Sequence, residues 1–254
     1  MHNWLKPWRV LALLVSFFFT AAPQAGELVR IAAASDLRYA LDDIIELYRE
    51  ANPGANVQVV YGSSGKMTTQ IINGAPYDIF FSADIAFPKK LQAEGMTATE
   101  PEVYALGRLV IWSNTVNAAE LTLEDLASSA ITRIAIAQPA HAPYGLRAQE
   151  ALQSAGVWEA VQPKLVFAEN IAHAAQMAAS GAAQVGIIAL SLARFPELAA
   201  HDHHLIDDNL HNPLTQGYVV TKRGGNKPDA ICFADFMATE PAHSIMEQYG
   251  FVMP

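Results

Sequence analysis

Cysteine is almost absent from this chain of 254 residues, in which Cys232 stands alone. A single cysteine excludes an internal disulfide, so the fold must be held together by its hydrophobic core. Hydrophobic residues make up 52% of the chain, enough for one or two domains. Cys232 lies in the apolar pattern AICFADFMA, and we expect it to be a buried filler of a helix.

Positive charge is also scarce. The chain has 16 Lys and Arg against 25 Asp and Glu, which gives a formal net charge of −9. No basic stripe runs along it, and this argues against a nucleic-acid partner. Any bound anion must therefore be held by local dipoles, against the long-range field of the protein.

Long apolar runs are missing except near the start. Residues 1–9 contain Lys6 and Arg9, residues 10–22 are apolar, and small residues follow. This pattern predicts a secretory signal peptide over residues 1–25, because the apolar run is short for a membrane span. We expect the mature protein in the periplasm, without membrane insertion. It has 14 basic against 25 acidic residues, a net charge of −11.

Strand and helix patterns alternate along the rest of the chain, which predicts an α/β fold with mixed, mostly parallel sheets and helices on both faces. Strands are expected at 28–34, 56–61, 77–82, 109–113, 132–137, 164–167, 184–190 and 217–222. Helices are expected at 36–50, 66–73, 86–94, 122–128, 144–155, 170–180, 190–195, 228–238 and 241–249.

The order of these patterns predicts two lobes. Lobe 1 comprises residues 26–107 and 217–254, and lobe 2 comprises residues 108–216. Two crossover strands would then form a hinge, and a ligand would bind in the cleft between the lobes.

Four helices are expected to open directly after a strand, at Ser35, Ser64, Tyr144 and Ile171. The first turn of a helix presents unpaired N–H groups and the positive end of the helix dipole. Helix starts at the carboxyl ends of parallel strands therefore form a natural anion site. Serine adds a hydroxyl donor without adding charge.

Asp36 places a carboxylate beside this predicted anion site. An acid in the first turn complements the helix dipole, but an acid that faced the cleft would disfavour a dianion. We therefore expect Asp36 to point away, toward Arg38 or Lys66. With no titrating group in the site, binding should change little with pH while the anion remains a dianion.

Short motifs of both lobes occur in a characteristic order. They are AAAS at 32–35, SSG at 63–65, QIINGAPYDIFFSAD at 70–84, APYGLRAQEAL at 142–152, AENI at 168–171, QVGIIAL at 184–190 and YGF at 249–251. In this order and spacing the chain resembles the periplasmic molybdate-binding proteins that feed ABC transporters, over almost the whole mature chain. The resemblance implies the two-lobed periplasmic binding protein fold, and a monomer that is not an enzyme.

The resemblance also implies one small inorganic oxyanion, molybdate or tungstate, bound by neutral donors, without a cofactor, and delivered to an inner-membrane ABC permease. Carried over by motif, the ligand-binding residues are Ala34, Ser35, Ser64, Tyr144 and Ile171. One departure concerns a tyrosine that some members have on the strand GIIAL, where this chain has Ala189. Those members have a small residue at the position of Tyr144, so we expect the Tyr144 hydroxyl to replace the missing donor.

Three alternatives remain open from the sequence. A protein of the same fold could bind another oxyanion, such as sulfate, phosphate or chromate. The segment His201–His211 contains HDHH and could bind a metal, although we expect a solvated irregular loop there. Ser63 and Lys66 match the Ser-x-x-Lys pattern of penicillin-recognising hydrolases, but the partner motifs are absent.

Overall fold

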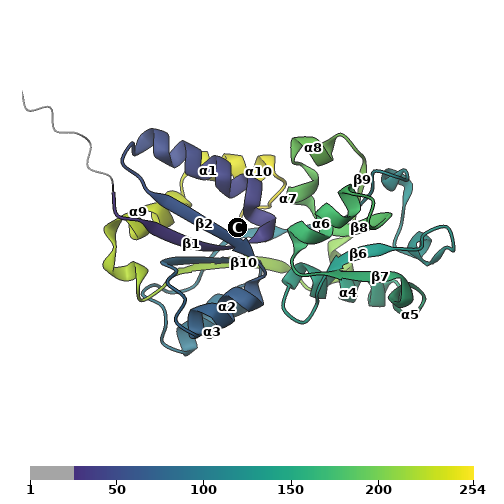
Figure 1. The fold of residues 1–254 in the computed structure, drawn as a ribbon, viewed down its shortest axis with the longest axis horizontal. Helices are drawn as coiled ribbons and strands as arrows, with labels where there is room; N and C mark the ends of the chain where they lie inside the picture. Colours follow the sequence, from purple (N-terminus) through teal and green to yellow (C-terminus); the bar gives the residue numbers. More distant parts are fainter. Residues whose placement is uncertain (1–25) are drawn as a thin grey trace, which may run out of the picture.

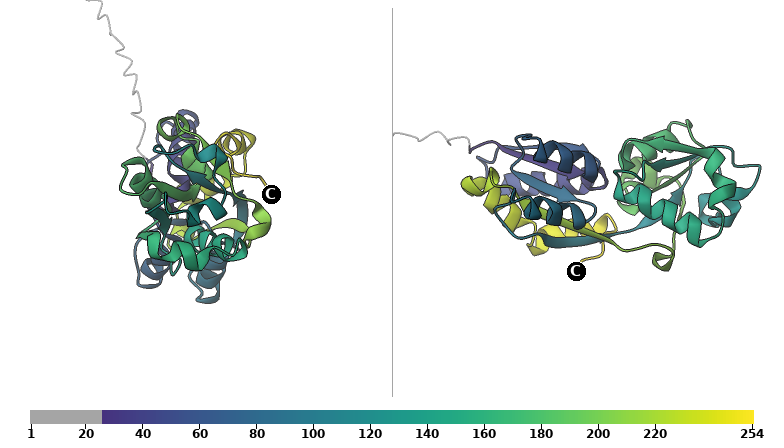
Figure 2. Two further views of the ribbon diagram at one scale, coloured as in Figure 1. Left: turned by 90° about the vertical axis from the view of Figure 1, so that its right-hand side faces the viewer. Right: turned by 90° about the horizontal axis from the view of Figure 1, so that it is seen from below.

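The computed structural model describes residues 26–254, so the predicted signal peptide at 1–25 lies outside the described residues. The chain forms two lobes that lie side by side, each built on a five-stranded sheet (Figures 1 and 2). The first sheet has the order β2-β1-β3-β10-β4 and the second the order β7-β6-β8-β5-β9. The strands are β1 Val29–Ala34, β2 Val57–Gly62, β3 Ile79–Ser82, β4 Glu102–Gly107, β5 Leu109–Trp112, β6 Ile134–Ala137, β7 Leu165–Ala168, β8 Val185–Ala189, β9 His203–Leu205 and β10 Leu214–Val220.

Helices pack on both sheets. They are α1 Arg38–Ala51, α2 Ser64–Ile72, α3 Ala86–Ala93, α4 Pro143–Ser154, α5 Trp158–Val161, α6 Ile171–Ala179, α7 Leu190–Ala193, α8 Pro196–Ala199, α9 Pro228–Phe236 and α10 Glu240–Gln248. A short 3-10 turn, η1 Ser35–Leu37, leads directly into α1. Within residues 26–254, no helix combines the length and the apolar character needed to cross a membrane.

The predicted α/β architecture with mixed sheets is confirmed, although parallel pairs do not outnumber antiparallel ones as predicted. β1 pairs in parallel with β2 and β3, and β6 pairs in parallel with β7 and β8. β10 and β5 are antiparallel to their neighbours, because each carries the chain across between the lobes. Parallel neighbours end at the same edge of a sheet, and this brings the helices that follow them together.

The two crossings occur at residues 107–109, between β4 and β5, and just before β10 (Figure 2, right). β10 begins at Leu214 and pairs with β4 from its first residue, so the return strand starts before the predicted residue 217. The division into lobes at 26–107 with 217–254, and at 108–216, stays a prediction about folding units. The C-terminal helices α9 and α10 pack against lobe 1 (Figure 1).

The prediction that Cys232 is buried is wrong, since its thiol is exposed on α9. Ala230, Phe233 and Ala234 form the buried face of this helix. These positions follow the spacing i, i+3, i+4, which leaves residue 232 on the opposite side. The helix is apolar on several sides, so its sequence does not show which face is buried.

A buried ionic cluster fastens α9 to the first sheet. Asp78 is fully buried just before β3, and its Oδ2 atom lies 3.0 Å from Nζ of Lys227 and accepts the N–H of Arg30 at 2.8 Å. Lys227 Nζ also donates to the carbonyl oxygen of Leu28 at 2.7 Å. Arg223 supplies a second cation, with its Nε atom 3.0 Å from Asp78.

We expect Lys227→Met to lower the free energy of unfolding by about 3 kcal/mol, because removing one partner leaves a buried carboxylate poorly compensated. Urea denaturation followed by circular dichroism measures this change. The exposed Lys222 is the matched control, and Lys222→Met should change stability by less than about 0.5 kcal/mol. Equal effects of the two substitutions would contradict the role of the cluster.

Candidate functional site

The helix starts that follow β1, β2, β6 and β7 meet at one small cavity between the lobes. Its volume is about 10 Å³. It is lined by Ala34, Ser35, Asp36, Gly62, Ser63, Ser64, Ala83, Ala142, Pro143, Tyr144 and Ile171. All five residues predicted to bind the ligand are in this lining, and each is at most 4% exposed.

Each helix start places first-turn residues in the wall of this cavity. Ser35 opens η1, Ser64 opens α2 and Ile171 opens α6, so their N–H groups have no acceptor within their own helices. Asn170 caps α6 as its position suggests, with its side chain accepting the N–H of His173 at 2.9 Å. Pro143 occupies the first position of α4, where the N–H that proline lacks would be unpaired anyway.

Close packing of α4 against β6 brings Tyr144 to the cavity. A Cβ atom at Gly145 would collide with the carbonyl group of Ala137, the last residue of β6. Glycine therefore lets the first turn of α4 sit directly on the end of the strand. Any larger residue here would push Tyr144 out of place.

The two serine hydroxyls have different partners. Ser64 Oγ accepts the N–H of Ala83 at 3.0 Å, which leaves its own proton available for an acceptor in the cavity. Ser35 Oγ accepts the N–H of Ala172 at 3.2 Å and donates to Oδ1 of Asn170 at 3.1 Å. Ser35 thus connects lobe 1 to the start of α6 in lobe 2.

Further contacts hold the lobes in a closed arrangement. The N–H of Gly65 donates to the carbonyl oxygen of His141 at 3.0 Å, and Arg147 forms an ion pair with Asp84 at 3.0 Å. Ser191 Oγ donates to the backbone oxygen of Asp36 at 2.8 Å. A cavity of about 10 Å³ holds roughly one water molecule, so a larger ligand enters when the lobes move apart.

The expectation that Asp36 points away from the cleft is wrong. Its side chain is buried in the cavity wall, and its Oδ2 atom accepts from Nε2 of Gln216 at 2.7 Å. The two cations proposed as partners lie elsewhere, with Arg38 over the ring of Tyr61 and Lys66 paired with Glu169. Asp36 points inward because it lies within the short turn η1 and not on the exposed face of α1.

Burial raises the pKa of Asp36 from 3.8 to about 6, although hydrogen bonds from Gln216 and Tyr144, and from nearby backbone N–H groups, oppose the rise. Burial, and then the charge of Asp36, raise the pKa of the Tyr144 hydroxyl well above its ordinary value. Tyr144 is therefore a neutral hydroxyl at any physiological pH. Asp36 can exchange a proton near neutrality.

Gln216 joins these groups, and the sequence analysis missed it. Its Nε2 atom donates to the Tyr144 hydroxyl oxygen at 3.0 Å, and its Oε1 atom accepts from the hydroxyl of Tyr104 at 2.5 Å. Gly107 makes room for this group, since a Cβ atom there would collide with the Tyr144 hydroxyl. The available signal was a glutamine inside the apolar pattern of β10.

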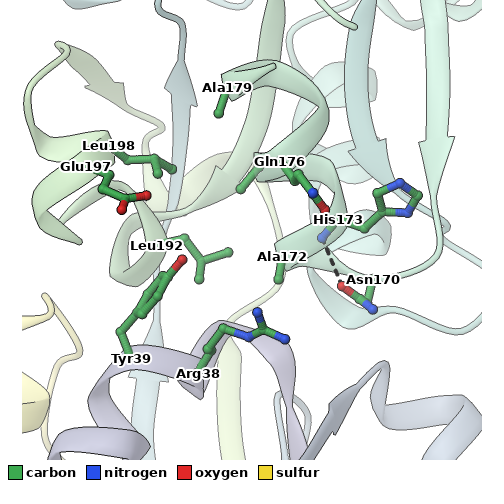
Figure 3. A pocket seen from close by; sticks show the side chains of 11 residues that line it. Arg38, Tyr39, Asn170, Ala172, His173, Gln176, Ala179, Leu192, Glu197 and Leu198 are labelled. Atoms are coloured by element: carbon green, nitrogen blue, oxygen red, sulfur yellow. Dashed lines mark hydrogen bonds between the residues drawn. The ribbon is translucent and has the colours of Figure 1, made fainter. Parts of the chain in front are cut away.

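A second, larger hollow of about 380 Å³ lies between α1 and the helices α6 to α8 (Figure 3). Arg38 and Tyr39 face Gln176 and Glu197 across it (Figure 3). Beside it, the ring of Tyr39 stacks on Phe195 with centroids 3.5 Å apart. Its wall contains both a guanidinium, from Arg38, and a carboxylate, from Glu197, beside polar and apolar side chains, and none of the five predicted ligand-binding residues lines it.

Ser63 and Lys66 do not contact each other through their side chains, because each has another partner. Ser63 Oγ lies 3.0 Å from Nδ1 of His141, whereas Nζ of Lys66 lies 3.0 Å from Oε1 of Glu169. Burial, followed by the nearby charge of Lys66, lowers the pKa of His141. The lysine is thus engaged across the cleft mouth and does not serve as a base for the serine.

The histidine segment is not the irregular loop that we expected, because His203 and His204 belong to the edge strand β9, which pairs with β5. The histidines also have separate neighbours. His201 packs edge-on against Trp112, and Nδ1 of His211 lies 2.8 Å from the carbonyl oxygen of Asn212. Over residues 26–254, no three His, Cys, Asp or Glu residues gather in a way that could hold a metal ion.

Known proteins share both this fold and this length. The family model described as bacterial extracellular solute-binding protein matches residues 29–252. The molybdate-binding protein ModA of Rhodobacter capsulatus is 35% identical over 246 residues, covering 95% of this chain and 94% of that protein. ModA of Azotobacter vinelandii is 32% identical over 245 residues, covering 96% of each chain.

Solved structures give the same result. The periplasmic molybdate-binding protein of Azotobacter vinelandii superposes with a TM-score of 0.83 at 32% identity, covering 89% of this chain and 99% of that one. The sulfate-binding protein SubI of Mycobacterium tuberculosis has a TM-score of 0.68 at 14% identity, a likeness of fold alone. The chain therefore belongs to the bacterial extracellular solute-binding protein family.

Proposed function

We propose that this protein captures a tetrahedral oxyanion, molybdate and also tungstate, in the interlobe cavity and delivers it to an inner-membrane ABC permease. One observation carries the proposal: four helix starts and the Ser64 hydroxyl converge on a cavity whose lining contains no lysine, arginine or histidine among the described residues. The names of the full-length relatives, molybdate-binding proteins, favour this ligand over other oxyanions.

The donors suit a dianion that has lost its water. An anion taken out of water needs about as many hydrogen bonds as it had before. The N–H groups of Ser35, Ser64, Tyr144 and Ile171, with the hydroxyl of Ser64, supply them in fixed positions. The Ser35 hydroxyl already donates to Asn170, and the Tyr144 hydroxyl, which is hydrogen-bonded to Asp36 here, would turn to the anion as a further donor. Ala34 forms part of the wall. The anion is bound through its oxygens, and no residue of this chain coordinates the metal atom.

Cavity size would provide selectivity. Molybdate and tungstate are nearly equal in size and larger than sulfate. Lobes that close on the larger ions, around a cavity wider than the about 10 Å³ of this arrangement, would leave donors unmatched around sulfate. Each unmatched donor costs about 1–3 kcal/mol. Sulfate, phosphate and chromate remain the alternative ligands of the same cavity.

Binding would be coupled to lobe closure. The contacts of Ser35 with Asn170, of Gly65 with His141 and of Arg147 with Asp84 all cross the cleft. A bound anion draws the helix starts of both lobes together and favours this closed arrangement. The protein would act as a periplasmic monomer, present the closed surface to the permease, and catalyse no reaction.

Isothermal titration of the mature protein tests the ligand. We expect tight one-to-one binding of molybdate and tungstate, and no measurable binding of sulfate or phosphate at the same concentrations. Binding heat with sulfate or phosphate, and none with molybdate or tungstate, would leave the proposed cavity standing but overturn the proposed ligand. No heat with any of the four anions would contradict the proposed function.

Ser64→Ala tests the cavity itself. Loss of one hydrogen bond to a charged group is worth about 1.5–3 kcal/mol, so the Kd for molybdate should rise by roughly 10- to 100-fold. The exposed Thr69 lies on the same helix, and Thr69→Ala should bind like the wild type. Thermal unfolding of both variants would show that each is folded. Wild-type affinity of Ser64→Ala would place the anion elsewhere.

A further inference from the structure

Among residues 26–254, Asp36 supplies the one carboxyl group in the lining of the anion cavity. It is 1% exposed, and its Oδ1 atom is buried without a hydrogen-bond partner among the described residues. A buried oxygen of this kind is unusual and calls for an explanation. Its place in the lining makes an anion in the cavity the candidate partner of this oxygen.

An ionised Asp36 is incompatible with a dianion in the same cavity. Two like charges a few ångströms apart in a buried site repel strongly, and one of them gains a proton in response. No cation in the cavity lining offsets the repulsion. Either the anion is excluded or a proton enters with it.

We propose that Asp36 is a further binding residue, and that one proton enters the site with each oxyanion and lies between Oδ1 of Asp36 and an oxygen of the anion. This inference rests on the proposed function and adds to it the protonation state of the complex. The proton comes from solvent, and no bond other than this hydrogen bond forms or breaks. Whether the proton is bonded to Asp36 or to the anion, the two groups then attract each other through a hydrogen bond and no longer repel.

Hydrogen bonds around the carboxyl group assign the proton to Oδ1. Oδ2 accepts from the amide of Gln216 at 2.7 Å, so Oδ2 must keep its lone pair toward that donor. The hydroxyl of Tyr104, a donor to Oε1 of Gln216, holds the amide in this orientation. Oδ1 is left as the atom that can carry a proton toward the cavity.

The groups that face Asp36 from neighbouring elements are all uncharged. Tyr144 faces it from α4 and hydrogen-bonds its carboxyl group, Tyr104 faces it from β4, and the pKa of each hydroxyl is raised by burial. Gln216 faces it from β10, and Ser191 of α7 donates to its backbone oxygen. The pKa of about 6 in the free protein supports the proposal, because a proton can be taken up near neutral pH.

The sign of the pH dependence follows from this uptake. Above a pH of about 6, free Asp36 is ionised, so each binding event must take a proton from solvent. The Kd then rises with pH, by up to about tenfold per pH unit. The sequence alone predicted binding that is flat in pH, and this is the point on which the two expectations differ.

Isothermal titration with molybdate, between about pH 7 and about pH 9, tests the inference in two buffers of different ionisation enthalpy. For the wild type we expect uptake that approaches one proton per anion and a Kd that rises with pH. Asp36→Asn keeps the shape and places an amide donor at the carboxyl position. It should bind with no proton uptake and a flat Kd over this range.

Glu46→Gln is the matched control, because Glu46 is an exposed acid on α1. It should keep the wild-type proton uptake. Wild-type binding without proton uptake would overturn the inference and leave the proposed function standing. Uptake that persists in Asp36→Asn would overturn the assignment to Asp36. No binding of molybdate or tungstate at any pH would overturn both the inference and the proposed function. The wild-type measurement tests the inference even if Asp36→Asn does not fold.

Discussion

The N–H groups in the first turn of a helix have no partner within that helix, and much of this structure serves to place four such turns around one point. β1 and β2 end at one sheet edge in lobe 1, and β6 and β7 end at one edge in lobe 2. Parallel pairing makes the helix starts of each lobe converge. The crossover strands then turn the two edges toward each other across the cleft.

Closure and binding share the same groups in this arrangement. Ser35 both lines the cavity and contacts Asn170 of the opposite lobe. Gln216 lies on the return strand β10 and contacts Asp36 of lobe 1 and Tyr144 of lobe 2. A ligand that alters the hydrogen bonds of these residues therefore alters the balance between open and closed lobes directly. Coupling between binding and lobe closure therefore requires no chain of residues that links the site to a distant hinge.

Local sequence signals predicted the helix starts, because the strand patterns end in small or polar residues at Ser35, at Ser64 and at Asn170, just before Ile171. Neighbours distant in the chain decided the features that were missed. Gln216 reaches Asp36 across 180 positions, and no local pattern indicates such a contact. Cys232 is exposed because the buried face of α9 is set by lobe 1. The edge strand β9 has three residues, too few to show a period.

The absence of a positively charged side chain among the described residues of the cavity lining makes a carrier of this kind more specific. A lysine or arginine would attract any anion of suitable size, and its charge would remain after release. Neutral donors stabilise only an anion whose oxygens lie at the positions that the donors can reach. Asp36 extends this logic, since an ionised carboxylate within the wall repels anions until a proton accompanies them. In a chain of net charge −9, the same carboxylate also repels anions that bind without that proton.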